Sequence, residues 1–155
     1  RPGQGSFQPA GALHAYLEGA DVELMANSDN VLRGGLTPKH IDVEELLGTL
    51  SFRDGPPPIL EGRATSETSR EYETPAEEFA LERIEVAPGV PYSGGREHSA
   101  DSLIVTDGSA SVVAAGRTLL LQRGGCAIVP ANVPYSIAAR APRAVIYKAG
   151  VPAPA

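Results

Sequence analysis

The second half of the chain is a succession of short apolar and β-branched runs, separated by residues that favour tight turns. Asp107-Gly108 and Gly124-Gly125 are typical of these separators. Short strands with a turn about every 8 to 12 residues are typical of an antiparallel sandwich or barrel. The pattern predicts strands over 79–86, 101–106, 109–114, 118–122, 126–129, 135–139 and 144–148.

The first half of the chain carries a weaker pattern. Two short stretches, 4–9 and 21–26, have the composition of half-buried strands. A helix is predicted within 37–52, because Asp42 and Glu45 have the spacing of a helix N-cap and three leucines follow them as an apolar stripe.

Composition divides the chain into parts. Residues 53–78 are polar and rich in proline, which predicts a linker or a surface excursion. We therefore expect one structural part over 1–52 and another over 79–150, with 151–155 as a tail.

The overall composition excludes several classes of protein. The chain has 155 residues, a net charge of −6 and no block of Lys or Arg, so we expect no nucleic-acid partner. No run approaches the roughly 18 apolar residues of a membrane span, so we expect no membrane partner. One cysteine, Cys126, excludes an intrachain disulfide and a zinc site made of several cysteines. Because the chain starts at Arg1 and its one methionine is Met25, we expect a processed chain or a portion of a longer protein.

Four residues near the start of the chain have a recognisable spacing. Gly3, Pro9, Gly11 and His14 follow the pattern G-x5-P-x-G-x2-H, which resembles the second motif of the cupin β-barrels. In that motif the Pro and Gly form a tight turn, and the His on the next strand points into the mouth of the barrel as a metal ligand. A single histidine is more often structural, so the spacing alone leaves both interpretations open.

A longer resemblance starts at the same histidine. Residues 14–39 read HAYLEGADVELMANSDNVLRGGLTPK. This segment is similar to the signature of the type I mannose-6-phosphate isomerases, zinc-dependent cupin enzymes that interconvert mannose 6-phosphate and fructose 6-phosphate. Gly34 is a departure, since the family usually has Ala there.

The resemblance implies a mainly β fold with one short helix. Residues 79–150 would form a cupin-type antiparallel β-barrel or jelly roll without metal, and 1–52 would supply the terminal strands of a second, catalytic cupin barrel. The chain would then be the C-terminal portion of a cytoplasmic enzyme, with a sugar phosphate as substrate and the missing N-terminal half of the enzyme as partner.

Three residues of the segment match the family's reacting centre. The resemblance implies that His14 ligates the zinc, that Arg33 stabilises negative charge near the reacting part of the sugar, and that Glu23 is a candidate for the catalytic base. An aldose–ketose isomerase needs such groups, because it moves a proton between neighbouring carbons and stabilises an enediolate. Without the resemblance, a structural ion pair between Glu23 and Arg33 would be the favoured interpretation.

Three further residues match positions that line the substrate pocket. The resemblance implies that Tyr16, Lys39 and Asp29 bind the substrate. From the residues alone, Tyr16 could be a packed aromatic, Lys39 a solvated residue before a helix, and Asp29 a residue that caps a turn.

The rest of the zinc site is missing from the sequence. In the family, a Q-x-H pair and a glutamate precede the histidine that His14 matches, and no Q-x-H occurs in this chain. One histidine does not make a tetrahedral zinc site. We therefore expect the chain alone to bind zinc poorly and to be inactive as an isomerase.

A decayed copy of the cupin turn is expected in the second half of the chain. Gly125, Pro130 and Tyr135 follow a similar spacing, with Pro or Tyr where the metal-binding histidine would fall. His98 is expected in a loop, and Cys126 as a small buried residue. The alternative to an enzyme is a non-catalytic cupin module that binds a sugar phosphate or serves in assembly.

Overall fold

The computed structural model of the chain describes residues 1–28, 30–52, 55–95 and 97–152. Its described part holds twelve strands and one short helix. In chain order these are β1 (Gly5–Ser6), α1 (Val43–Thr49), β2 (Ile59–Leu60), β3 (Arg63–Ala64), β4 (Ser69–Tyr72), β5 (Ala80–Val86), β6 (Tyr92–Gly94), β7 (Asp101–Asp107), β8 (Ser109–Ala114), β9 (Arg117–Gln122), β10 (Cys126–Val129), β11 (Tyr135–Ala139) and β12 (Ala144–Gly150).

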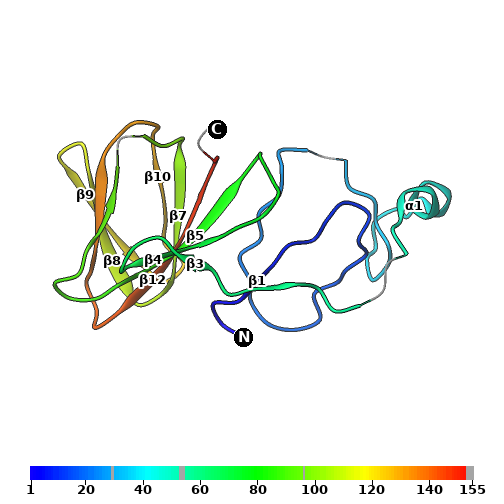
Figure 1. The fold of residues 1–155 in the computed structure, drawn as a ribbon, viewed down its shortest axis with the longest axis horizontal. Coiled ribbons are helices and arrows are strands. Elements are labelled where there is room, and N and C mark those ends of the chain that lie inside the picture. Colours follow the sequence, from blue (N-terminus) through cyan, green and yellow to red (C-terminus); the bar gives the residue numbers. More distant parts are fainter. Residues whose placement is uncertain (29, 53–54, 96, 153–155) are drawn as a thin grey trace.

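Two antiparallel sheets form the larger part of the molecule (Figure 1). The order of the six-stranded sheet is β10-β7-β12-β5-β4-β3, and that of the four-stranded sheet is β6-β11-β8-β9. The sheets pack face to face through alternate residues of their strands, as in a jelly roll. This arrangement confirms the predicted mainly β, antiparallel, cupin-like fold with one short helix.

The core lies between the two sheets. Ile84, Val105 and Ile146 from the six-stranded sheet and Val112 and Ile137 from the four-stranded sheet belong to one buried apolar cluster. The strands are half-buried because one face of each sheet meets the core and the other meets solvent. All seven strands predicted from 79 onward are confirmed, with bounds that differ by a few residues at most.

The predicted linker, 53–78, contains regular structure that the sequence pattern missed. β4 pairs with β5 from Ser69↔Ile84 to Tyr72↔Leu81, so it is a full member of the six-stranded sheet. Tyr72 is buried, and its ring stacks on Tyr147 at a centroid distance of 6.5 Å. The second half of this segment is therefore part of the sandwich, while the domain limits themselves stay a prediction.

The first 52 residues lie to one side of the sandwich as an open path with little regular structure (Figure 1). The predicted strand 4–9 shrinks to β1, which pairs with β2. The predicted strand 21–26 is wrong: within the described residues, none of 12–42 is in a strand or helix. A strand needs a neighbour to accept and donate its backbone hydrogen bonds, and the described residues place no strand beside this segment.

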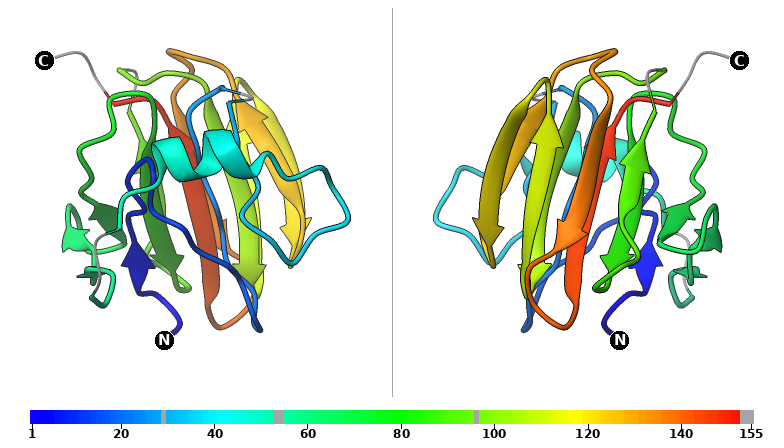
Figure 2. Two further views of the ribbon diagram at one scale, coloured as in Figure 1. Left: turned by 90° about the vertical axis from the view of Figure 1, so that its right-hand side faces the viewer. Right: turned by 90° about the vertical axis from the view of Figure 1, so that its left-hand side faces the viewer.

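The predicted helix is confirmed as α1, which faces the viewer in the left panel of Figure 2. The Oδ1 atom of Asp42 accepts a hydrogen bond from the backbone N–H of Glu45 at 3.1 Å, which is the predicted N-cap. None of the residues of α1 is buried. The described chain has no helix that is long and apolar enough to cross a membrane.

A tyrosine of the sandwich contacts the open path. The hydroxyl of Tyr72 donates to the carbonyl oxygen of Gly3 at 2.6 Å. A Cβ atom at Gly5 would come within 2.9 Å of the same ring. Glycine therefore lets β1 lie directly on the tyrosine, which fixes the start of the segment that leads to His14.

Candidate functional site

The site predicted from residues 14–39 lies on the open path, away from the buried core. His14, Tyr16, Glu23, Arg33 and Lys39 are all exposed. Asp29, which was also predicted to bind substrate, lies outside the described residues.

Three of the predicted site residues come together. The Tyr16 hydroxyl donates a hydrogen bond to Glu23 Oε1 at 3.0 Å, although seven positions separate the two residues. The rings of His14 and Tyr16 meet edge to face, with centroids 5.9 Å apart. Partial burial of the hydroxyl, and then the Glu23 carboxylate beside it, raise the pKa of Tyr16 to about 12. Tyr16 is therefore a hydrogen-bond donor at neutral pH, and it orients the carboxylate of Glu23.

A contact of the His14 ring favours the tautomer that metal-binding histidines use. Its Nδ1 lies 3.0 Å from the carbonyl oxygen of Ala12, which only accepts hydrogen bonds. In the neutral ring, that contact places the proton on Nδ1 and leaves the lone pair of Nε2 available. Metal-bound histidines use this arrangement, with the second ring nitrogen donating to a carbonyl or carboxylate.

His14 fits zinc as one ligand of a set. Within the described ranges, no three His, Cys, Asp or Glu side chains gather as a metal site. A tetrahedral zinc ion needs more ligands than His14 provides.

Arg33 and Lys39 lie on the loop that follows, and no described contact joins their side chains to His14, Tyr16 or Glu23. Only the backbone N–H of Lys39 has a described partner, the Thr37 hydroxyl at 3.2 Å. Leu13 ties this loop to the histidine: a Cβ atom at Gly34 would meet Leu13 Cδ1 at 2.3 Å. Gly34 thus accommodates a leucine beside Arg33, at the position where the resembling family usually has Ala.

A second polar cluster, which the sequence interpretation missed, lies inside the sandwich. His98 is in a loop, as predicted, but its side chain is only 11% exposed. Its ring meets Tyr135 edge to face at 5.6 Å, and its Nδ1 lies 3.3 Å from Asp101 Oδ2. The Tyr135 hydroxyl donates to the same carboxylate oxygen at 2.8 Å.

This cluster sits where the decayed cupin turn was predicted. His98 Nε2 also lies 3.0 Å from the carbonyl oxygen of Val133, in the loop before Tyr135. Tyr135, at the histidine position of the turn, was the sequence signal that could have predicted this cluster. Cys126, expected to be buried, is exposed because the alternation of β10 turns Ala127 and Val129 inward instead.

Comparison with known proteins identifies the relatives of this chain. The mannose-6-phosphate isomerase 2 of Arabidopsis thaliana is 32% identical over 150 residues, which are 97% of this chain and 34% of that protein. The mannose-6-phosphate isomerase of Salmonella typhimurium is 36% identical over 132 residues, which are 84% of this chain and 33% of that protein. The chain is homologous to the mannose-6-phosphate isomerases. The predicted resemblance to these isomerases is thereby confirmed.

The solved structures agree with the sequences. The apo form of mannose 6-phosphate isomerase from Salmonella typhimurium superposes with a TM-score of 0.67 and 31% sequence identity, over 82% of this chain and 32% of that one. No family model matches the chain. The chain spans about a third of the length of the mannose-6-phosphate isomerases it matches.

Proposed function

We propose that the chain is the C-terminal portion of a zinc-dependent mannose-6-phosphate isomerase, which interconverts mannose 6-phosphate and fructose 6-phosphate in the cytoplasm. The observation that carries the proposal is the cluster of His14, Tyr16 and Glu23 within the segment that resembles the family's signature. Homologous proteins named mannose-6-phosphate isomerase support this reaction as the proposed function.

His14 would hold zinc through Nε2, together with ligands from the missing N-terminal half of the enzyme. A bound zinc ion supplies Lewis-acid polarisation of the sugar oxygens at C1 and C2. The Nδ1 contact with Ala12 supports this role, because it fixes the orientation of the ring before the metal arrives.

Glu23 is the proposed proton carrier from this part of the enzyme. In the aldose-to-ketose direction, a base removes the proton from C2 and returns it to C1 through a cis-enediol. The hydrogen bond from Tyr16 holds one oxygen of Glu23, and the other oxygen would accept the proton from the sugar. Arg33 would stabilise the negative charge that develops on the sugar oxygens, while Tyr16, Lys39 and Asp29 would bind the sugar phosphate.

The role of Arg33 is tested in the full-length enzyme. Arg33→Ala should lower kcat by roughly 100-fold or more, as the loss of a group that stabilises developing charge does. Arg1→Ala is a matched control, since Arg1 is also exposed but lies outside the signature segment. Unchanged isomerase activity in Arg33→Ala would remove Arg33 from the proposed site.

A non-catalytic module is the second candidate function. The observation that favours it is that, among the described residues, no three His, Cys, Asp or Glu side chains gather as a metal site, and the cluster of His14, Tyr16 and Glu23 is exposed. Equilibrium binding of mannose 6-phosphate with no turnover, even when the upstream portion of the enzyme is supplied, would favour a sugar-phosphate sensor over an isomerase.

A further inference from the structure

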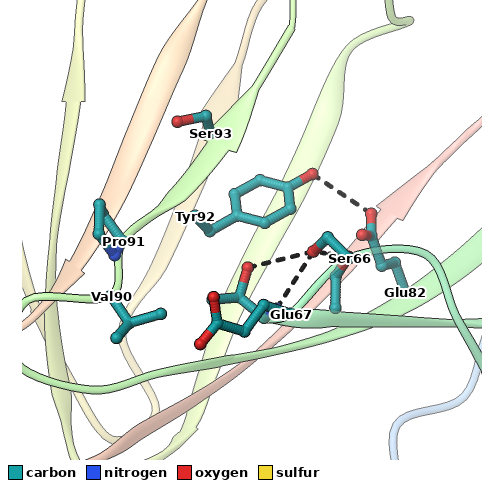
Figure 3. Close-up of a pocket in the computed structure, with 9 residues that line it drawn as sticks. Ser66, Glu67, Glu82, Val90, Pro91, Tyr92 and Ser93 are labelled. Atoms are coloured by element: carbon teal, nitrogen blue, oxygen red, sulfur yellow. Dashed lines mark hydrogen bonds between the residues drawn. The ribbon is translucent and has the colours of Figure 1, made fainter.

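A hydroxyl-lined cavity opens on the sandwich and shares no residue with segment 14–39. Figure 3 shows it between the turn that precedes β4 and the start of β6. Its volume of about 420 Å³ is within the range of small-molecule sites. The lining residues are Ser66, Glu67, Thr68, Ser69, Glu82, Val90, Pro91, Tyr92 and Ser93.

Hydrogen bonds hold the turn that forms one wall of the cavity. Ser66 Oγ lies 2.8 Å from Ser69 Oγ and accepts from the backbone N–H of Thr68 at 3.2 Å. The carbonyl oxygen of Thr68 in turn accepts from the backbone N–H of Glu85 in β5 at 2.7 Å. The hydroxyls are therefore fixed in place before any ligand binds, which lowers the entropic cost of binding.

A carboxylate forms the far wall of the cavity. The Tyr92 hydroxyl donates to Glu82 Oε2 at 3.3 Å (Figure 3). Lys148 Nζ forms an ion pair with the same oxygen and lies 3.1 Å from the Tyr92 hydroxyl. These hydrogen bonds and ion contacts outweigh burial and raise the pKa of Lys148 above its usual value. The described contacts of Glu82 all use Oε2, so Oε1 is available to accept from a ligand hydroxyl.

The charges of the lining select the kind of ligand. Glu67 and Glu82 are the charged residues of the lining, and neither arginine nor lysine is among its described members. Lys148, outside the lining, neutralises Glu82, so the like charge that a phosphate would meet there is that of Glu67. Hydroxyl groups both donate and accept hydrogen bonds, and carboxylates accept strongly from them.

We propose that this cavity is a binding site for an uncharged polyhydroxyl compound of the size of a free hexose. Ser66, Ser93 and the two carboxylates would bind successive hydroxyl groups of such a ligand, and the apolar side chains of Val90 and Pro91 would cover its carbon-bound hydrogens. The proposal does not depend on the isomerase function.

The test is a titration of the ¹⁵N-labelled protein with D-mannose, followed at the backbone amide resonances of Ser66 to Ser69 and of Tyr92. Mannose should shift these resonances saturably, with a dissociation constant of about a few millimolar, as expected for a ligand of this size. Mannose 6-phosphate should bind at these amides at least a few-fold more weakly. Absence of saturable shifts, or tighter binding of the phosphate, would overturn the proposal.

Two variants show whether the cavity itself binds the sugar. Glu67→Gln should weaken mannose binding about tenfold and Ser66→Ala about fivefold, as expected for a charged and a neutral hydrogen bond. Glu67 and Ser66 are exposed, so both variants should fold. Glu77→Gln is the control, because Glu77 is exposed outside the cavity and should leave binding unchanged. Equal affinity in all three variants would place the sugar elsewhere and contradict the proposal.

Discussion

The sandwich and the open path differ in how far they bury their apolar side chains. In the sandwich, alternate residues of both sheets fill a closed core, where Ile84 and Ile137 are 0% exposed. On the open path, Leu17 and Leu36 are 88% and 89% exposed. A core residue of the sandwich therefore stabilises this fold by its own packing, whereas exposed residues such as Leu17 and Leu36 do little for it.

The residues that stabilise the fold therefore lie in a different part of the molecule from the residues proposed to act in catalysis. The sandwich carries the core, and the open path carries the cluster that resembles an active site. Tyr72 links the two parts through its hydrogen bond to Gly3. Four predictions probe the difference, from the largest expected effect to the smallest.

Truncating the sandwich core should have the largest effect. Ile137→Ala removes a fully buried side chain and should lower the free energy of unfolding by about 2–5 kcal/mol. Urea denaturation measures it. Leu17→Ala is the control and should change stability by less than about 0.5 kcal/mol. Equal losses in the two variants would contradict the contrast between the two parts.

Removing one hydroxyl inside the sandwich should have the next largest effect. Tyr135→Phe deletes the donor to the Asp101 carboxylate, which is 3% exposed and would lose a hydrogen bond. The expected loss in the free energy of unfolding is about 1–3 kcal/mol. Tyr16→Phe removes the hydroxyl of a largely exposed side chain and should cost much less, so a larger loss there would reverse the expected order.

Removing the hydroxyl of Tyr72 should loosen the link between the parts. Tyr72→Phe keeps the stacked ring but loses the hydrogen bond to Gly3, at a cost of about 1 kcal/mol. Hydrogen exchange should become faster in β1 and the residues near it, and stay unchanged in β7 and β12. Faster exchange in the central strands as well would mean that the two parts unfold as one.

The pH dependence of the open path should report the Tyr16–Glu23 contact. Because the pKa of Tyr16 is raised to about 12 in the folded chain, the contact favours folding below about pH 10, the ordinary tyrosine pKa, and this contribution is lost as the pH rises toward 12. Glu23→Gln should move the pKa down toward 10, because it removes the negative charge. Ultraviolet titration, with Tyr16→Phe as the blank, would show no difference between wild type and Glu23→Gln if the contact were absent.

The strands of the sandwich could be predicted well from the sequence, because most of them carry a local pattern that marks where they begin and end. In 101–106 and 135–139, apolar residues alternate between two faces, and turn residues bound each run. β4 escaped prediction because Arg70 and Glu71 make it polar, and its place depends on pairing with β5 rather than on a pattern of its own. Local sequence does not encode such pairing.

The open path shows the same limit of sequence-based prediction, here through a predicted strand that does not form. Residues 21–26 have the composition of a strand, but within the described chain they have no partner strand and stay irregular. The resemblance nevertheless selected His14, Tyr16 and Glu23, which the structure brings together. It did not predict that His98, Asp101 and Tyr135 would meet, because their contacts depend on how two loops of the sandwich fold together.

We propose that His14 and its neighbours form one part of a zinc-dependent isomerase site that the rest of the enzyme would complete. The most direct measurement is zinc content and turnover of mannose 6-phosphate for the chain alone and for the chain combined with the upstream portion of the enzyme. We predict little bound zinc and no turnover for the chain alone, with zinc and turnover in the combination that are lost in His14→Ala. Stoichiometric zinc and turnover by the isolated chain, or full activity of the His14→Ala combination, would contradict the account.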